Sequence, residues 1–210
     1  MLSLPAVLRD TARLYRAFFG RTLVLTGLVF AVVCLVETVG PWPVVLLSIV
    51  GTAVVQGALV EAVDQERKHR TGGLFQATWK RAGALLGVSL LTGIGVALGL
   101  FLLVVPGLIL FTRWSLAVPA VMLEGRSPRD AMRRSRELVQ GHGWQVFAVF
   151  LTVTAAAGLV SFLLERLLVD AVGLWLSLTV ASTLTTPFAA HALNVVYYRV
   201  VDPGRPVLQD

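Results

Sequence analysis

One stretch of the chain, from Ala82 to Leu123, holds 42 residues and a single charged side chain, Arg113. An α-helix rises about 1.5 Å per residue, so about 20 apolar residues cross the hydrocarbon core of a bilayer. The stretch is long enough for two crossings, and Pro106–Gly107 near its middle has the residue types expected at a turn. It therefore predicts a helical hairpin inside a membrane.

The composition extends this conclusion to the whole chain. Apolar residues make up 56% of the 210 residues and charged residues only 14%, which excludes an ordinary soluble domain. The formal net charge is +6, but the basic residues lie between apolar runs. We therefore expect anionic lipid head groups, and no nucleic acid, as partners. The single cysteine, Cys34, excludes an intrachain disulfide.

Apolar segments of spanning length recur along the rest of the chain. Gly40–Pro43 cannot continue a helix because its two prolines lack amide hydrogens, and Glu165–Asp170 is expected to be a short outer loop. Pro187 is expected to kink the last span. We predict an all-α membrane protein with six transmembrane helices arranged as three hairpins, at residues 22–62, 82–123 and 144–198.

A basic amphipathic segment precedes each predicted hairpin. These segments are an interfacial helix at residues 1–21, a basic loop or helix at 63–81 and a basic helix at 124–143, and a tail follows at 199–210. The threefold recurrence is either an internal duplication or a chance succession of hairpins. Of the 18 basic residues, 16 lie on the side of the N-terminus, and such residues accumulate in cytoplasmic loops. We predict that both termini are cytoplasmic.

The segment from Ser127 to Gln140 has the features of a helix start. Ser127 can cap the helix, Pro128 suits its first turn, and Asp130 follows Ser127 at capping-box spacing. Its arginines are candidates for binding lipid head groups, at about 1 kcal/mol for each basic residue near an anionic surface; they are Arg129, Arg133, Arg134 and Arg136. The alternative is a solvated loop whose charges only set the topology.

Four polar residues inside the predicted spans are further candidates for a site: Arg113, Glu37, His191 and Asn194. A charged side chain at the centre of a bilayer costs about 3 kcal/mol, so Arg113 is the strongest of them. We expect Arg113 to reach the outer surface or to pair with Glu37 or Glu165, and contact with a substrate is the alternative. His191 and Asn194 share a helix face and are expected to hydrogen-bond a neighbouring helix.

We find no catalytic constellation, metal-ligand set or cofactor motif in the sequence. The three histidines lack a second ligand at metal-binding spacing, and no glycine-rich phosphate loop is present. Glycines at GxxxG spacing predict close contact between helices; they are Gly83, Gly87, Gly95 and Gly99.

The centre of the chain resembles a known family. The pattern P-G-x-x-x-x-x-R-W-x-x-A-x-P-A-x-x-x-E-G, then A-M-R-R-S-R-E-L-V-x-G and a tryptophan, is similar to the membrane-domain family named after glycerophosphoryl diester phosphodiesterases. The matching positions are Pro106, Gly107, Arg113, Trp114, Pro119, Glu124, Gly125, Ala131, Arg134, Ser135, Gly141 and Trp144. The resemblance implies a multi-span protein of a bacterial inner membrane. The family name comes from members with a separate catalytic barrel, for which six spans leave no room in 210 residues.

These observations favour a non-enzymatic membrane protein that binds anionic lipid or partner proteins in envelope maintenance, with a homo-oligomer as one form of partner. The alternative is a small transporter or lipid translocase that uses Arg113 and the polar groups of the last span. An intramembrane enzyme is a third hypothesis. A continuous polar cavity around Arg113 would favour transport, whereas a closed, glycine-packed bundle with exposed basic helices would favour binding.

Overall fold

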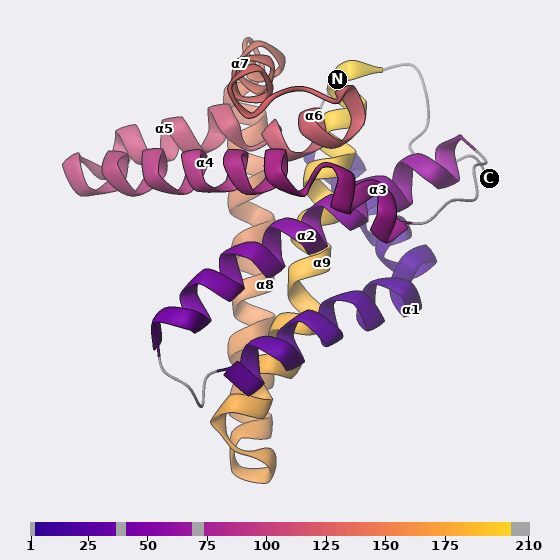
Figure 1. Ribbon diagram of the computed structural model, residues 1–210, viewed down its shortest axis with the longest axis vertical. Helices are drawn as coiled ribbons and strands as arrows, with labels where there is room; N and C mark the ends of the chain where they lie inside the picture. Colours follow the sequence, from indigo (N-terminus) through magenta and orange to yellow (C-terminus); the bar gives the residue numbers. More distant parts are fainter. Residues whose placement is uncertain (1–2, 37–40, 69–73, 203–210) are drawn as a thin grey trace.

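The computed structural model describes residues 3–36, 41–68 and 74–202, and every regular element in these ranges is an α-helix (Figure 1). This confirms the predicted all-α class. The helices are α1 (Leu4–Val36), α2 (Pro41–Arg67), α3 (Leu74–Lys80), α4 (Ala82–Leu102), α5 (Val104–Trp114), α6 (Ala117–Glu124), α7 (Pro128–Val139), α8 (Gly143–Val172) and α9 (Leu174–Val201).

Pairs of long helices extend from one common region of the molecule. Helices α4 and α5 lie side by side, as do α8 and α9, and the two pairs point in different directions (Figure 1). Helices α1 and α2 also contact each other. The shorter helices α3, α6 and α7 lie where the long helices meet. We call α6, α7 and the helix ends that contact them the junction.

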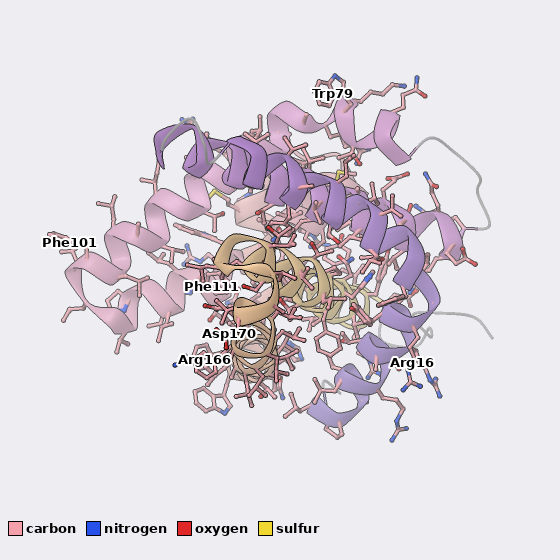
Figure 2. The ribbon with its side chains drawn as sticks, turned by 90° about the horizontal axis from the view of Figure 1, so that it is seen from below. Arg16, Trp79, Phe101, Phe111, Arg166 and Asp170 are labelled. Atoms are coloured by element: carbon pink, nitrogen blue, oxygen red, sulfur yellow. The ribbon has the colours of Figure 1, made fainter. Side chains whose placement is uncertain are left out.

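One continuous core of buried side chains joins the junction to α1, α2 and α9, whereas the long helices expose apolar side chains away from it. The continuous core includes Val7, Leu14, Val63, Leu85, Leu116, Val121 and Val195, none more than 1% exposed. In contrast, Phe101 at the far end of α4 (Figure 2) is 90% exposed. Leu167 of α8 is 76% exposed. Apolar surface of this kind is stable in hydrocarbon and costly in water.

Three helical segments of the described chain are long and apolar enough to cross a membrane, and a fourth qualifies if the bent helix α1 counts as one span. The three are Ala82–Leu102, Val105–Glu124 and Gly143–Val172. Helix α1 bends by 72° between Leu4–Gly20 and Thr22–Val32, which is where we expected the interfacial segment to give way to the first span. Six crossings stay a prediction.

Two turns lie at residues other than those predicted from the sequence. The turn within residues 82–123 is at the extended residue Leu103 (φ −162°, ψ 140°), and Pro106–Gly107 belongs to the first turn of α5. Proline is tolerated there because the first amides of a helix have no intrahelical acceptor. The predicted outer loop Glu165–Asp170 is wrong, because α8 continues to Val172 and ends at Gly173, whose φ of 82° favours glycine.

Helix α9 continues past Pro187 because α1 supplies partners for its backbone. Proline lacks the amide that would donate to the carbonyl four residues earlier, which is that of Thr183. The Thr26 hydroxyl of α1 lies 3.2 Å from this oxygen, and the Tyr15 hydroxyl donates to the next carbonyl, Leu184, at 2.9 Å. Such compensation matters most where water is excluded.

Candidate functional site

Helix α7 begins where the sequence predicts. Ser127 has extended backbone angles, its hydroxyl oxygen lies 3.4 Å from the amide nitrogen of Asp130, and Pro128 is the first helical residue. The hydroxyl donates in turn to the Asp130 carboxylate at 2.6 Å. This hydrogen bond and the charge of Arg133 hold the pKa of Asp130 below its usual range. The predicted cap is therefore confirmed.

The four arginines predicted to bind head groups have different environments in α7. Arg133 donates to Asp130 at 2.8 Å, and Arg134 donates to Glu124 at 3.1 Å and lies 3.7 Å from Glu137. Among the described residues, neither the Arg129 nor the Arg136 side chain has a hydrogen bond or an ion pair. Head-group binding stays a prediction for all four, and Arg129 and Arg136 are the two free to take part without breaking an internal contact.

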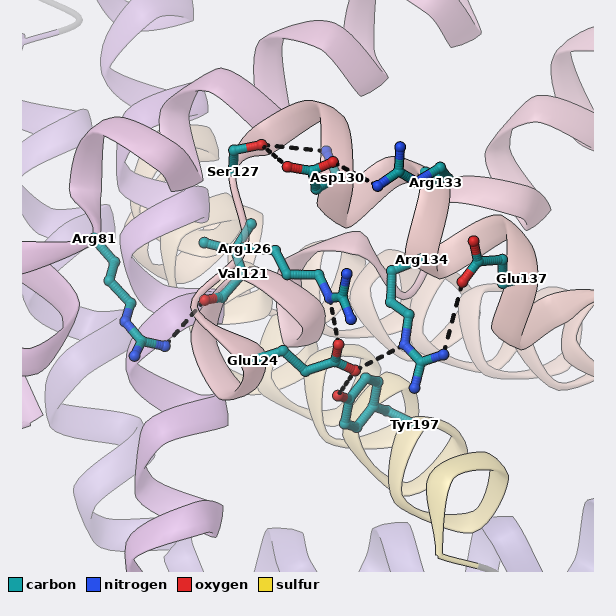
Figure 3. Close-up of polar contacts among 10 residues, drawn as sticks. All are labelled: Arg81, Val121, Glu124, Arg126, Ser127, Asp130, Arg133, Arg134, Glu137 and Tyr197. Carbon is teal, nitrogen blue, oxygen red and sulfur yellow. Dashed lines mark hydrogen bonds and ion pairs between the residues drawn. The ribbon is translucent and has the colours of Figure 1, made fainter.

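Glu124, at the end of α6, gathers three donors into one cluster (Figure 3). Its carboxylate accepts hydrogen bonds from Arg126, from Arg134 at 3.1 Å and from the Tyr197 hydroxyl of α9 at 2.7 Å. The Glu124 and Arg134 side chains are 20% and 30% exposed. Sequence reasoning missed this role, although a lone carboxylate between an apolar helix and a run of arginines was a usable signal. The cluster joins α6, α7 and α9.

Arg81 holds the C-terminal end of α6. Gly125 follows that helix with φ 67°, a conformation that favours glycine, and its amide donates to the Val121 carbonyl at 3.1 Å. The Arg81 guanidinium donates to the carbonyls of Val121, at 3.0 Å, and of Met122. A cation is favourable at a helix C-terminus, where the macrodipole is negative. Arg81 thus has a structural role, and sequence reasoning assigned it only to a basic loop.

Ser135 of α7 bridges the break between α5 and α6. Its hydroxyl donates to the backbone carbonyl of Arg113 at 2.8 Å and accepts from the amide of Leu116 at 3.1 Å. Both backbone groups lie at helix ends, and Ser135 is fully buried. An unsatisfied backbone group in this position would be costly. The bridge fixes the end of α5, and with it the position of Arg113, against α7.

Close contacts at glycines hold α5 against α4, as the GxxxG spacing predicted. A Cβ atom at Gly99 would lie 2.8 Å from the Cα of Gly107 in α5, and one at Gly95 would lie 2.4 Å from the Trp114 ring. A Cβ atom at Gly87 would lie 2.8 Å from Pro128. Nothing lies within 4 Å of such an atom at Gly83. Three of the four glycines therefore make the predicted close contacts.

A pocket of about 660 Å³ lies between α5, α7 and the start of α8. Its charged lining side chains are Arg113 and Arg136, and Gln140 and Thr112 are its polar neutral ones. Its apolar wall comes from α5 and α8 and consists of Val105, Leu108, Ile109, Trp144 and Phe147, with Val139 of α7. We call this the arginine pocket. It brings together Arg136, one of the four α7 arginines, and Arg113 of the candidate span Val105–Glu124.

Arg113 lies within the candidate span Val105–Glu124, and its depth in the membrane stays a prediction. The break after Trp114 places Arg113 at the α7 end of α5, where it shares a pocket with Arg136 and Trp144. Glu165 follows Trp144 by 21 residues of continuous helix, about 31 Å at 1.5 Å per residue, which is too far for an ion pair. Glu37 lies outside the described residues. Among the described residues the Arg113 guanidinium has no partner.

His191 and Asn194 of α9 are buried, at 0% and 2% exposure, and lie away from the arginine pocket. Both ring nitrogens of His191 and the side-chain nitrogen of Asn194 lack a hydrogen-bond partner among the described residues. The expected hydrogen bonds from these nitrogens to a neighbouring helix are therefore not present there. The His191 ring instead stacks on Phe18 of α1, with 6.1 Å between ring centroids.

Among the described residues, no three side chains of the His, Cys, Asp and Glu types are grouped to hold a metal ion. Comparison with known families gives one match. The family described as "Membrane domain of glycerophosphoryl diester phosphodiesterase" matches residues 86–199, which include α5, α6, α7 and the whole arginine pocket. No curated protein and no solved structure matches the chain.

Proposed function

The chain belongs to this membrane-domain family, and on that basis we propose that it is a non-enzymatic, multi-pass membrane protein that binds anionic lipid at its basic face. We propose further that it supports envelope maintenance, alone or with a membrane protein partner or a second copy. One observation carries the proposal: two arginines that have no partner among the described residues line a pocket with Trp144, which is 78% exposed. Arginine attracts anionic head groups, and tryptophan favours the membrane interface.

The proposal includes a threading of six crossings in a bacterial inner membrane, with both termini in the cytoplasm. Its support is the distribution of basic residues, 16 of 18 on one side. Arg166 and Asp170 lie near the C-terminal end of α8, which this threading puts outside. Single cysteines in a Cys34→Ser background test it. Asp170→Cys should react with an impermeant thiol reagent in intact cells, and Gln140→Cys should react only after lysis. The reverse pattern would refute the threading.

Lipid binding is tested on the full chain purified in mild detergent. We expect native mass spectrometry to show retained phosphatidylglycerol in preference to phosphatidylcholine with the same acyl chains. Retention should fall as salt is raised, because exposed charges are screened beyond about 10 Å at 0.1 M. Equal retention of the two lipids at all salt concentrations would contradict the proposal.

The transport alternative has less support from the described residues. A path using Arg113 and the last span would need a polar cavity common to both. The arginine pocket is lined by α5, α7, α8 and the α7–α8 turn, and no residue of α9 lines it. Reconstitution in liposomes separates the two hypotheses. Lipid scrambling or solute flux that is lost in Arg113→Ala would favour transport.

A further inference from the structure

Two arginines line the arginine pocket, and none of its described lining residues carries a compensating negative charge. No carboxylate is among its lining residues, and neither the Arg113 nor the Arg136 guanidinium has a partner among the described residues. Two cations that face one cavity repel each other unless an anion neutralises them. Guanidinium groups bind phosphate oxygens through several N–H donors in a fixed geometry. The pocket is therefore complementary to a phosphate-bearing ligand.

The walls of the same pocket are complementary to hydrocarbon. Val105 and Ile109 of α5 are 66% and 47% exposed, and Leu108 and Phe147 lie on the same lining. A free phosphate ion would leave these side chains uncovered. An amphiphile would cover them while its charge met the arginines. The volume of about 660 Å³ falls in the range of sites for drug-sized ligands, which suits a head group with the first part of its acyl chains.

The start of α8 adds two features to the pocket. His142, the N-cap residue of this 30-residue helix, makes no side-chain capping hydrogen bond among the described residues, and Gly143 and Trp144 of the first turn line the pocket. Uncapped amides at a helix N-terminus attract an anion. Trp144, which is largely exposed, is the side chain expected at the level of lipid head groups. A tryptophan in the lining is therefore compatible with a pocket that takes a lipid head group.

We infer that the arginine pocket binds one molecule of anionic phospholipid, with its phosphate on Arg113 and Arg136 and its acyl chains along α5 and Phe147. The inference rests on the proposed lipid binding and goes further. It replaces a diffuse attraction to a basic surface with a single bound lipid, and it assigns the intramembrane arginine to the head group of that lipid.

The test compares two arginines of the same helix. Arg136 lines the pocket, whereas Arg129 does not, and neither side chain has an internal partner among the described residues. In native mass spectrometry of the full chain with phosphatidylglycerol, Arg136→Gln and Arg113→Gln should each weaken binding about fivefold. The double variant should weaken it about 25-fold. Arg129→Gln, which removes the same charge, should stay within about twofold of the wild type.

A second measurement uses the wild-type chain and needs no variant to fold. Phosphatidylglycerol with a photoreactive diazirine in its acyl chain should cross-link to peptides that contain Ile109 or Phe147. An excess of glycerol phosphate, a soluble phosphate ester without acyl chains, should not displace it. Displacement by glycerol phosphate would overturn the phospholipid and leave a soluble anion as the ligand.

The outcomes separate this inference from the broader proposal. If Arg113→Gln and Arg136→Gln bind as well as Arg129→Gln and cross-links lie elsewhere, the pocket is not the site. The proposed function would still stand if the wild type prefers phosphatidylglycerol in a salt-dependent way. If the wild type shows no such preference, both the inference and the proposed function fail.

Discussion

Arg134 and Arg136 lie two residues apart on α7, and they differ in whether the protein supplies an anion for them. Arg134 meets Glu124 and Glu137 at the junction, and the adjoining cavity of about 430 Å³ is lined by both acidic and basic side chains. Arg136 lines a pocket that has no carboxylate among its described lining residues. An arginine whose counter-ion is internal stabilises the fold, whereas one without an internal counter-ion is available to a ligand.

The largest effect should come from removing the anion of the junction. Glu124→Gln leaves Arg134, whose side chain is only 30% exposed, without its main partner. Breaking such a partly buried pair should lower the free energy of unfolding by about 2–4 kcal/mol. Denaturant unfolding in detergent micelles measures this loss. Glu137→Gln is the matched control, because its pair is longer, 3.7 Å, and its side chain is 54% exposed, so about 0.5 kcal/mol is expected. Equal losses of stability in Glu124→Gln and Glu137→Gln would show that the acid of the junction matters no more than an exposed one, and the contrast between Arg134 and Arg136 would fail.

The next effect should come from the contact that holds α5 in place. A methyl group at Gly107 would lie 2.6 Å from the backbone nitrogen of Leu100, so Gly107→Ala must push α5 away from α4. We expect a loss of about 2 kcal/mol and, because Arg113 moves with α5, weaker phospholipid binding. Thermal unfolding and lipid titration are the measurements.

Gly93→Ala is the control for that substitution, since nothing lies within 4 Å of its Cβ position. Alanine should stabilise α4 there by up to about 1 kcal/mol through helix propensity. If Gly107→Ala destabilises no more than Gly93→Ala, the close packing of α4 on α5 does not hold the pocket.

How well the sequence predicts a feature of this fold depends on how far apart in the chain the contacting residues lie. Local patterns predict well: the cap at Ser127, the close contact at Gly99 and the apolar surface of α8 follow from residue type and spacing. The outer loop at Glu165–Asp170 was wrong because charged residues are good helix formers and an exposed helix can carry them past the apolar segment.

The site itself depends on contacts that spacing does not reveal. Tyr197 reaches Glu124 across 73 positions, and Ser135 meets the backbone of Arg113 across 22. The four α7 arginines look equivalent in sequence, and only the fold separates those paired with acids from those that have no partner among the described residues. The break after Trp114, which brings Arg113 beside α7, was not predicted, because Val105–Glu124 is apolar enough to read as one continuous span.

A smaller loss of stability is expected from substitution of Ser135, which links the junction to the arginine pocket. Ser135→Ala leaves the Arg113 carbonyl and the Leu116 amide without their side-chain partner, at a cost of about 1–2 kcal/mol to the free energy of unfolding. Phospholipid affinity should fall as well, because the end of α5 is no longer tied to α7. Ser161→Ala is the control, since its partner Thr185 keeps a bond to the Ala181 carbonyl. Unchanged lipid affinity in Ser135→Ala would show that Arg113 is positioned by other contacts.

The smallest effect should come from the cap of α7, which touches neither set of arginines directly. Ser127→Ala removes the side chain that accepts from the Asp130 amide and should cost about 1 kcal/mol. Because the pKa of Asp130 is lowered in the folded chain, its contribution to stability is present above about pH 4 and is lost as the pH falls through the folded value. Unfolding measured between pH 3 and 7 should therefore show a smaller pH dependence in Ser127→Ala.

Arg134 and Ser135 still anchor the helix in Ser127→Ala, so phospholipid affinity should not change. A loss of affinity equal to that of Arg136→Gln would mean that the arginine pocket depends on the whole of α7. The junction and the arginine pocket would then form a single structural unit.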